Sequence, residues 1–221
     1  MTEVKHPAPY SKSVIEAMKF LVVTEADRRG IKIDDLRILD PMAGIGRVHE
    51  LPGATVGVEI EPEWASQHPG TRQGDACDLG WPEDTFDVIA VSPAYGNRFA
   101  DHHEAKDGSK RRSYRHDLGR MPSEGSSGTL HWGPDYRFLH IKAWREATRV
   151  LVPGGLFILN VSDFVAKGAI VPVAEWHLNE LFCLRYRLES AQTISTPRMR
   201  FGANHQARVD GELVAALRAA S

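Results

Sequence analysis

Short apolar segments alternate with helical patterns along the chain, and this alternation constrains the fold more than any other feature of the sequence. Apolar residues recur at helical spacing across 11–29, where Ser11 or Ser13 can cap a helix and Gly30 can end it. Apolar strands are then expected, in order, at 36–39, at 54–60, just before Gly74 and at 86–91. Strands that alternate with helices predict a mostly parallel sheet with helices on both faces.

The second half of the chain resumes the pattern after an irregular segment. Residues 97–134 are rich in Gly, Ser, His, Lys and Arg and show little periodicity, so they predict a long basic insert. Helices are expected at 136–151 and 171–181, and strands at 156–161, 183–194 and 212–217. We predict one Rossmann-like α/β domain over 1–221, whose seven-stranded, mostly parallel sheet carries one antiparallel strand at its edge.

Composition and charge limit the partners and the cellular location expected for such a domain. A net charge of −2 excludes a polycation that coats DNA by charge alone, but it leaves room for a local basic groove. No run of eighteen apolar residues predicts a membrane span. The first ten residues lack a signal pattern, and Cys77 and Cys183 lack metal-ligand spacing, so we expect a cytoplasmic protein with reduced thiols, either a monomer or a homodimer.

Acidic and glycine residues gather where ligands bind in open α/β sheets, beyond the carboxyl ends of the strands. The first strand is followed by Asp40-Pro-Met-Ala-Gly-Ile-Gly46, whose glycines allow a tight turn and a close approach of the backbone to a ligand. Glu59 comes about 20 residues after Asp40, the offset at which an acid accepts hydrogen bonds from a ribose. Together with Asp75 at the third strand end, these residues predict a nucleotide site.

The residues around the glycine turn favour one nucleotide cofactor. A dinucleotide fingerprint requires Gly or Ala where His49 stands, and Asp40 would repel a pyrophosphate. The same acid suits the ammonium and sulfonium groups of S-adenosylmethionine (AdoMet). We therefore expect AdoMet rather than NAD.

Two motifs in this order resemble those of a known family. Asp40-Pro-Met-Ala-Gly-Ile-Gly46 resembles motif I of the amino-group DNA methyltransferases, and Ser92-Pro-Ala-Tyr95 resembles their motif IV, (Asp/Asn/Ser)-Pro-Pro-(Tyr/Phe/Trp). His6 to Ser11 is similar to the segment before their first helix, and Val150-Leu-Val-Pro-Gly-Gly155 to a turn common to class I AdoMet-dependent methyltransferases. The resemblance covers roughly 5–195 and implies AdoMet-dependent methylation of cytosine N4 or adenine N6 in DNA.

The resemblance also implies roles for individual residues. Asp40 and Gly44 would meet the methionine part of AdoMet, Glu59 the ribose, and Asp75 with Ala76 the adenine. The full set of implied cofactor-binding residues is Pro9, Tyr10, Asp40, Pro41, Met42, Ala43, Gly44, Gly46, Glu59, Ile60, Asp75, Ala76 and Ser92. The sequence departs from motif IV at Ala94, which replaces the second proline. Serine at the first position, Ser92, slightly favours cytosine N4 over adenine N6 as the methylated atom in the family.

The chemistry requires an acceptor for the target amine. An exocyclic amine is a poor nucleophile because its lone pair is delocalised into the ring, and hydrogen bonds that accept its protons favour a pyramidal nitrogen. Ser92 Oγ and the Pro93 carbonyl are the predicted catalytic acceptors. Tyr95 would stack on the base. The base itself would be flipped out of a duplex or taken from a single strand.

Basic residues beside motif IV are the predicted substrate contacts. We expect phosphate or base contacts from Asn97, Arg98, Arg111, Arg112 and Arg115 in the insert, and from Arg198 and Arg200 between the last strands. A solvated surface loop and an exposed hairpin tip are the respective alternatives. No metal is expected, because His102-His103 with Asp101 or His116 fits no standard zinc spacing.

Other substrates and roles stay open. No stretch of the sequence has room for a separate target-recognition domain, so an RNA base or a protein glutamine amide is an alternative acceptor for the same methyl transfer. A module that binds nucleotide or DNA without catalysis is a second alternative, from a different class.

Overall fold

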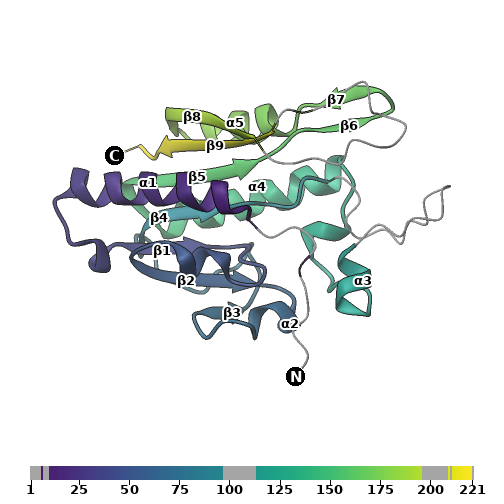
Figure 1. Cartoon of the computed structure of the whole chain (residues 1–221), viewed down its shortest axis with the longest axis horizontal. Helices are drawn as coiled ribbons and strands as arrows, with labels where there is room; N and C mark the ends of the chain where they lie inside the picture. Colours follow the sequence, from purple (N-terminus) through teal and green to yellow (C-terminus); the bar gives the residue numbers. More distant parts are fainter. Residues whose placement is uncertain (1–5, 7–9, 97–112, 196–208, 210, 221) are drawn as a thin grey trace.

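The computed structural model describes residues 6, 10–96, 113–195, 209 and 211–220. In this described part, seven strands form one sheet in the order β3-β2-β1-β4-β5-β9-β8 (Figure 1). The strands are β1 Arg37–Asp40, β2 Ala54–Glu59, β3 Thr71–Gln73, β4 Phe86–Val91, β5 Leu151–Val161, β8 Arg187–Ser195 and β9 Gly211–Arg218. All neighbouring pairs up to β5 are parallel, while β9 runs antiparallel to both of its neighbours, as predicted for a single antiparallel strand.

The first helix, α1 (Lys12–Arg29), begins and ends where its sequence predicts. Ser11 Oγ accepts a hydrogen bond from the Val14 amide at 3.2 Å and so satisfies one of the amides that the first turn leaves without a partner. Gly30 ends the helix at φ 65°, a left-handed conformation that glycine adopts without steric cost.

Side chains alternate between the two faces of the sheet, and each face has its own helical cover. Ile38, Val88 and Ile158 pack with the apolar side chains of α1. The alternate positions along the same strands pack with α4 (Pro134–Val150) and α5 (Val173–Cys183) on the opposite face. Figure 1 shows α1 crossing one face and α4 lying behind the sheet. The prediction of helices on both faces is confirmed.

The antiparallel strand does not lie at the edge of the sheet, which corrects the expectation from sequence. β9 lies between β5 and β8, and β8 is the edge strand. The reason is polarity: β9 carries Leu213-Val214-Ala215-Ala216-Leu217 and is mostly buried, while nearly every residue of β8 is exposed. An apolar strand gains more from pairing on both sides than a polar one does.

Several elements go beyond the sequence prediction. β5 starts at Leu151, before the Pro-Gly-Gly turn, because Leu151 already pairs with Phe86. The glycine turn leads into a 3₁₀ segment, Arg47–Glu50, and a short helix α2 forms at Pro62–Ala65. The hairpin of β6 (Phe164–Ala166) and β7 (Ala169–Val171) was not predicted.

The described part of the insert is more ordered than predicted. Ser113 caps a short helix, α3 (Tyr114–Leu118), by accepting a hydrogen bond from the His116 amide at 3.2 Å, and a 3₁₀ turn follows at Ser127–Thr129. Figure 1 shows α3 beyond the end of the sheet at which β5 ends. Of the helices in the described residues, none is both long and apolar enough to cross a membrane.

Candidate functional site

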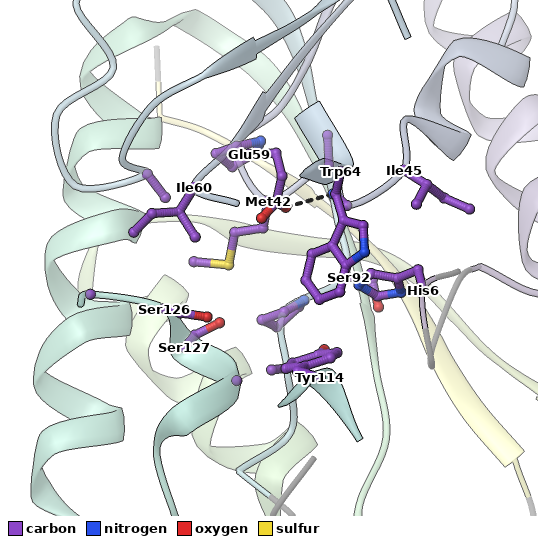
Figure 2. Close-up of a pocket in the computed structure, with 18 of the residues that line it drawn as sticks. His6, Met42, Ile45, Glu59, Ile60, Trp64, Ser92, Tyr114, Ser126 and Ser127 are labelled. Atoms are coloured by element: carbon purple, nitrogen blue, oxygen red, sulfur yellow. Dashed lines mark hydrogen bonds between the residues drawn. The ribbon is translucent and has the colours of Figure 1, made fainter. Parts of the chain in front are cut away.

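A pocket lies beyond the carboxyl ends of β1, β2 and β4, where the parallel sheet predicts a ligand site. Its free space, which includes solvent at its open mouth, is about 930 Å³. The predicted site residues that line it are Tyr10, Pro41, Met42, Ala43, Gly44, Glu59, Ile60, Asp75, Ala76, Ser92, Pro93 and Tyr95. Residues from the N-terminal segment, three strand ends and the insert thus meet around one cavity (Figure 2).

Glu59, at the end of β2, fastens the glycine turn that follows β1. Its Oε2 accepts a hydrogen bond from the Gly44 amide at 2.8 Å, and its Oε1 accepts one from the Glu61 amide at 2.9 Å. Gly44 has φ 53°, which few other residues adopt without strain. Burial raises the pKa of Glu59 to about 7, although the two hydrogen bonds by themselves lower it. The carboxyl group therefore titrates near neutral pH.

Asp40 lies behind the glycine turn rather than on the pocket wall. It is fully buried and accepts hydrogen bonds from the Tyr10 hydroxyl at 2.8 Å and from the Met42 amide at 2.9 Å. Burial raises the pKa of Asp40 to about 7. The side chain therefore positions two residues that do line the pocket. Gly46 also lies off the wall, where a Cβ would meet His68 at 2.9 Å.

Three aromatic rings form a wall on one side of the pocket. The ring centroids of His6 and Trp64 are 4.4 Å apart, and Tyr114 lies 5.3 Å from His6 and 5.2 Å from Trp64. Figure 2 shows the three rings together, across the pocket from Ile60. Trp64 was missed from the sequence because the four residues of α2 are too few to show a helical period.

The insert closes a second side of the pocket. Glu61 is fully buried and accepts hydrogen bonds from Arg120 Nη2 at 2.7 Å, the Ser123 amide at 2.7 Å and Ser123 Oγ at 2.9 Å. Arg120 Nε also donates to Glu63 at 2.7 Å. This clamp holds the pocket-lining residues Ser126, Ser127 and Gly128 in place.

Four polar side chains meet at the other end of the pocket: Ser92, Tyr95, Asn160 and Glu212, called here the acceptor cluster. Asn160 Nδ2 donates to Ser92 Oγ at 3.0 Å and to Glu212 Oε2 at 2.9 Å. The Tyr95 hydroxyl donates to Glu212 Oε2 and contacts Ser92 Oγ, both at 3.3 Å. Asn160 comes from β5 and Glu212 from β9, so strands distant in sequence complete the surroundings of the predicted motif IV serine.

Sequence reasoning missed Asn160 and Glu212. A buried asparagine within the apolar run Phe157-Ile-Leu-Asn-Val161 was the available signal, since a buried polar group requires hydrogen-bond partners. Glu212 offered none, because its contact with Ser92's neighbours depends on the position of β9 in the sheet.

The predicted substrate contacts are described only in part. Arg115 lies exposed on α3. Outside the described residues lie Pro9, Asn97, Arg98, Arg111, Arg112, Arg198 and Arg200, together with Asp101, His102 and His103. The part of the chain that the structure describes contains no group of three or more His, Cys, Asp or Glu residues able to hold a metal ion.

No protein-family model matches the sequence, and no curated protein matches it. Solved structures do match in fold. A SAM-dependent methyltransferase from Methanosarcina mazei is 13% identical with a TM-score of 0.53, over 88% of this chain and 97% of that one. A geranyl diphosphate methyltransferase in complex with GPP and sinefungin is 9% identical with a TM-score of 0.53, over 92% and 77%.

The [4+2]-cyclase SpnF is similar to the same extent, at 15% identity and a TM-score of 0.54, over 93% of this chain and 82% of that one. The chain therefore has the Rossmann-like fold of class I SAM-dependent methyltransferases. Because a cyclase shares this fold, the fold alone does not identify the reaction, which has to be inferred from the residues of the site.

Proposed function

We propose that the pocket binds AdoMet and that the protein is a methyltransferase. The described residues fit the cofactor. Glu59 accepts hydrogen bonds from the Gly44 and Glu61 amides, and a carboxylate has about four acceptor sites, so it can still accept a hydrogen bond from a ribose hydroxyl. Ile60, Trp64, Ala76 and Leu139 supply apolar surface for a flat adenine ring. The methyltransferase fold of the chain supports the same assignment.

The glycine turn argues against a dinucleotide. Pyrophosphate binding uses free backbone amides at the N-terminus of a full helix. Here the Gly44 amide donates to Glu59, and the turn leads into a 3₁₀ segment of four residues, Arg47–Glu50. Asp40 and Glu59 add two acids to the same turn. A cofactor with ammonium and sulfonium groups suits these surroundings better than an anion does.

The methyl acceptor that the site suits best is an exocyclic amine of a DNA base, cytosine N4 or adenine N6. One observation carries this proposal: Ser92, the first residue of the motif IV resemblance, lines the same pocket as the glycine turn and Glu59. AdoMet would supply an electrophilic methyl group. Ser92 Oγ and the Pro93 carbonyl would accept hydrogen bonds from the amine and orient its lone pair.

DNA as the substrate rests on the basic residues of the insert and on Tyr95. The described Arg115 is exposed on α3, next to the pocket-lining Tyr114, and suits a phosphate contact. The ring of Tyr95 lines the pocket and offers a surface for a flipped base. An RNA base or a glutamine amide has the same planar amine chemistry and is the alternative acceptor.

The test is transfer of labelled methyl from AdoMet to duplex DNA, single-stranded DNA, total RNA and a protein extract in parallel. Nucleoside analysis by mass spectrometry should find N4-methylcytosine or N6-methyladenine, and Ser92→Ala should abolish the signal with AdoMet still bound. Label in RNA or protein would show that the acceptor is RNA or protein and not DNA. AdoMet binding without transfer would support a binding module, and no binding of AdoMet would refute the proposal.

A further inference from the structure

The shorter hydrogen bonds of the acceptor cluster define one set of directions. Asn160 Nδ2 carries two protons and has three acceptors in reach: Glu212 Oε2 at 2.9 Å, Ser92 Oγ at 3.0 Å and the Tyr95 oxygen at 3.5 Å. The two nearer acceptors, Glu212 and Ser92, take the two protons. A carboxylate only accepts hydrogen bonds, so the single hydroxyl proton of Tyr95 goes to Glu212. The contact between Ser92 and Tyr95 must then be donated by Ser92.

This wiring leaves Ser92 with a lone pair for substrate. The hydroxyl oxygen has two lone pairs, of which Asn160 occupies one, and its proton points to Tyr95. Because Ser92 is one of the residues that line the pocket, the second lone pair is the one left for a substrate. Ser92 therefore offers an acceptor to a substrate and a donor to Tyr95, the arrangement that a proton needs in order to pass through a hydroxyl group.

We propose that Glu212 is the final proton acceptor of the reaction, reached from the substrate through Ser92 and Tyr95. The proposal rests on the proposed methyl transfer to an amine. It assigns to the chain a carboxylate that motif IV does not contain, supplied by β9 on the far side of the cluster. Glu212 acts through Tyr95 and does not touch the substrate, so it is a positioning residue.

The step balances in atoms and charge. AdoMet would supply the methyl group: the amine nitrogen would form its bond to the methyl carbon with its lone pair, and the electron pair of the broken carbon–sulfur bond would stay on sulfur. The nitrogen then carries a positive charge and one proton too many. That proton passes to Ser92 Oγ as the proton of Ser92 passes to Tyr95 and the proton of Tyr95 passes to Glu212 Oε2. The product is a neutral methylamine, and Glu212 ends as a neutral acid.

The direction of transfer follows from the charges. An amine that has just gained a methyl group is a strong acid, and a carboxylate is the strongest base in the cluster. Ser92 and Tyr95 start and finish neutral, with only their hydroxyl protons displaced. Without Glu212, the chain of hydroxyl groups has no base at its end, and the proton has to leave by exchange with solvent at the open side of the pocket.

Two conservative variants test the relay. Glu212→Gln retains an oxygen for the hydrogen bonds but cannot take up a proton, and Tyr95→Phe retains the ring but removes the hydroxyl. Each should lower kcat about 100-fold, the lower end of what general acid–base groups contribute. KM for the acceptor and Kd for AdoMet should stay within about twofold. Because both changes break one relay, the double variant should be no slower than the slower single variant.

A spectroscopic readout is independent of turnover. In protein labelled with ¹³C at tyrosine Cζ, the Tyr95 signal is the one that Tyr95→Phe removes from the five tyrosines. It should shift in Glu212→Gln without AdoMet, because its hydrogen-bond acceptor loses its charge. Glu175→Gln, at an exposed position in the first turn of α5, is the matched control and should change neither the signal nor kcat.

The outcomes separate this proposal from the proposed function. If the wild-type protein transfers no methyl group to any acceptor, both are overturned. If it does transfer and Glu212→Gln is as fast, the relay alone is overturned. An additive loss in the double variant, or a Tyr95 signal that does not move in Glu212→Gln, also contradicts the relay and leaves the methyl transfer standing.

Discussion

The Tyr136 hydroxyl donates a hydrogen bond of 2.7 Å to the carbonyl of Ala94 and so ties helix α4 to the loop that follows β4. The tie has a fixed direction. Trp144 Nε1 donates to His177 Nδ1 at 3.0 Å, so Nε2 of His177 carries the proton and donates to Tyr136 at 2.8 Å. Burial holds the pKa of His177 well below its usual value and keeps the ring neutral. The chain of donors therefore ends on the loop that carries Ser92.

The first prediction concerns this tie. Tyr136→Phe leaves the Ala94 carbonyl and His177 without their buried partner, which should cost about 1–3 kcal/mol of folding free energy. Since Ala94 stands where motif IV has its second proline, the loop should also lose its fixed position. We expect kcat for methyl transfer to fall about tenfold, with the affinity for AdoMet unchanged. Denaturant unfolding and steady-state kinetics measure the two effects.

Tyr186→Phe is the control for that variant. The Tyr186 hydroxyl contacts Thr148 Oγ1 at 3.1 Å, in the core between α4 and the sheet, and lines no part of the pocket. It should lower stability with kcat preserved. Equal loss of activity in both variants would mean that activity follows stability and that the tie to Ala94 has no role of its own.

The second prediction is that AdoMet binds more tightly as pH rises through 7. The pKa of Glu59 is about 7 in the free protein because the group is buried. Ribose hydroxyls and a cationic cofactor favour the ionised carboxylate, so binding should release a proton. Below pH 7 the Kd should rise up to tenfold per pH unit, and above it the Kd should level off. Calorimetry in buffers of different ionisation enthalpy measures both the Kd and the proton release.

Glu59→Gln should weaken binding and flatten its pH dependence. Asp40 also has a pKa of about 7, but its side chain lies behind the glycine turn and not on the pocket wall. A slope that persists unchanged in Glu59→Gln would move the titrating group from Glu59 to Asp40.

The third prediction separates two arginines of the insert. Arg120→Ala removes the clamp on the buried Glu61, so the segment that lines the pocket should loosen and the Kd for AdoMet should rise about tenfold. Arg115→Ala changes an exposed side chain of α3, five positions before Arg120, and should leave that Kd unaltered while it weakens binding of DNA. Titrations of both variants with AdoMet and with a DNA duplex check the pattern. Weaker AdoMet binding in Arg115→Ala together with weaker DNA binding in Arg120→Ala would contradict the prediction.

The fourth prediction uses glycines of the insert. A Cβ at Gly128 would overlap the ring of Tyr114, so Gly128→Ala should displace one of the three rings of the aromatic wall. AdoMet binding should weaken at least tenfold. Gly119→Ala is the control: its φ of 69° makes the substitution strained, but a Cβ there meets nothing within 4 Å. Similar losses in the two variants would indicate a general effect on the insert.

The sequence was most informative about elements whose signals are local. The cap at Ser11, the stop at Gly30 and the apolar strand at 86–91 each reside in neighbouring residues, and all three agree with the structure. The position of β9 inside the sheet could not be predicted from local sequence. It depends on which of two strands, the polar β8 or the apolar β9, pairs with β5.

The candidate site shows the same division. The glycine turn, Glu59 and Ser92 line one pocket because the ends of parallel strands meet at one edge. Trp64 and Glu212 could not be inferred, since their places depend on a one-turn helix and on a long-range strand pairing. Asp40 was expected at the cofactor, and only the structure reveals that Tyr10 and the Met42 amide occupy its carboxylate.

The interior position of β9 divides the site into two parts, which different strand pairings bring together. If β1 to β5 pair before β9 joins the sheet, the glycine turn, Glu59 and Ser92 are already together, because the pairings of those strands do not involve β9. Only the arrival of β9 brings Glu212 to Ser92 and Tyr95. Such a partly folded chain would then bind AdoMet while it still lacks the proposed proton acceptor, Glu212. The ability to bind the cofactor would precede the ability to react.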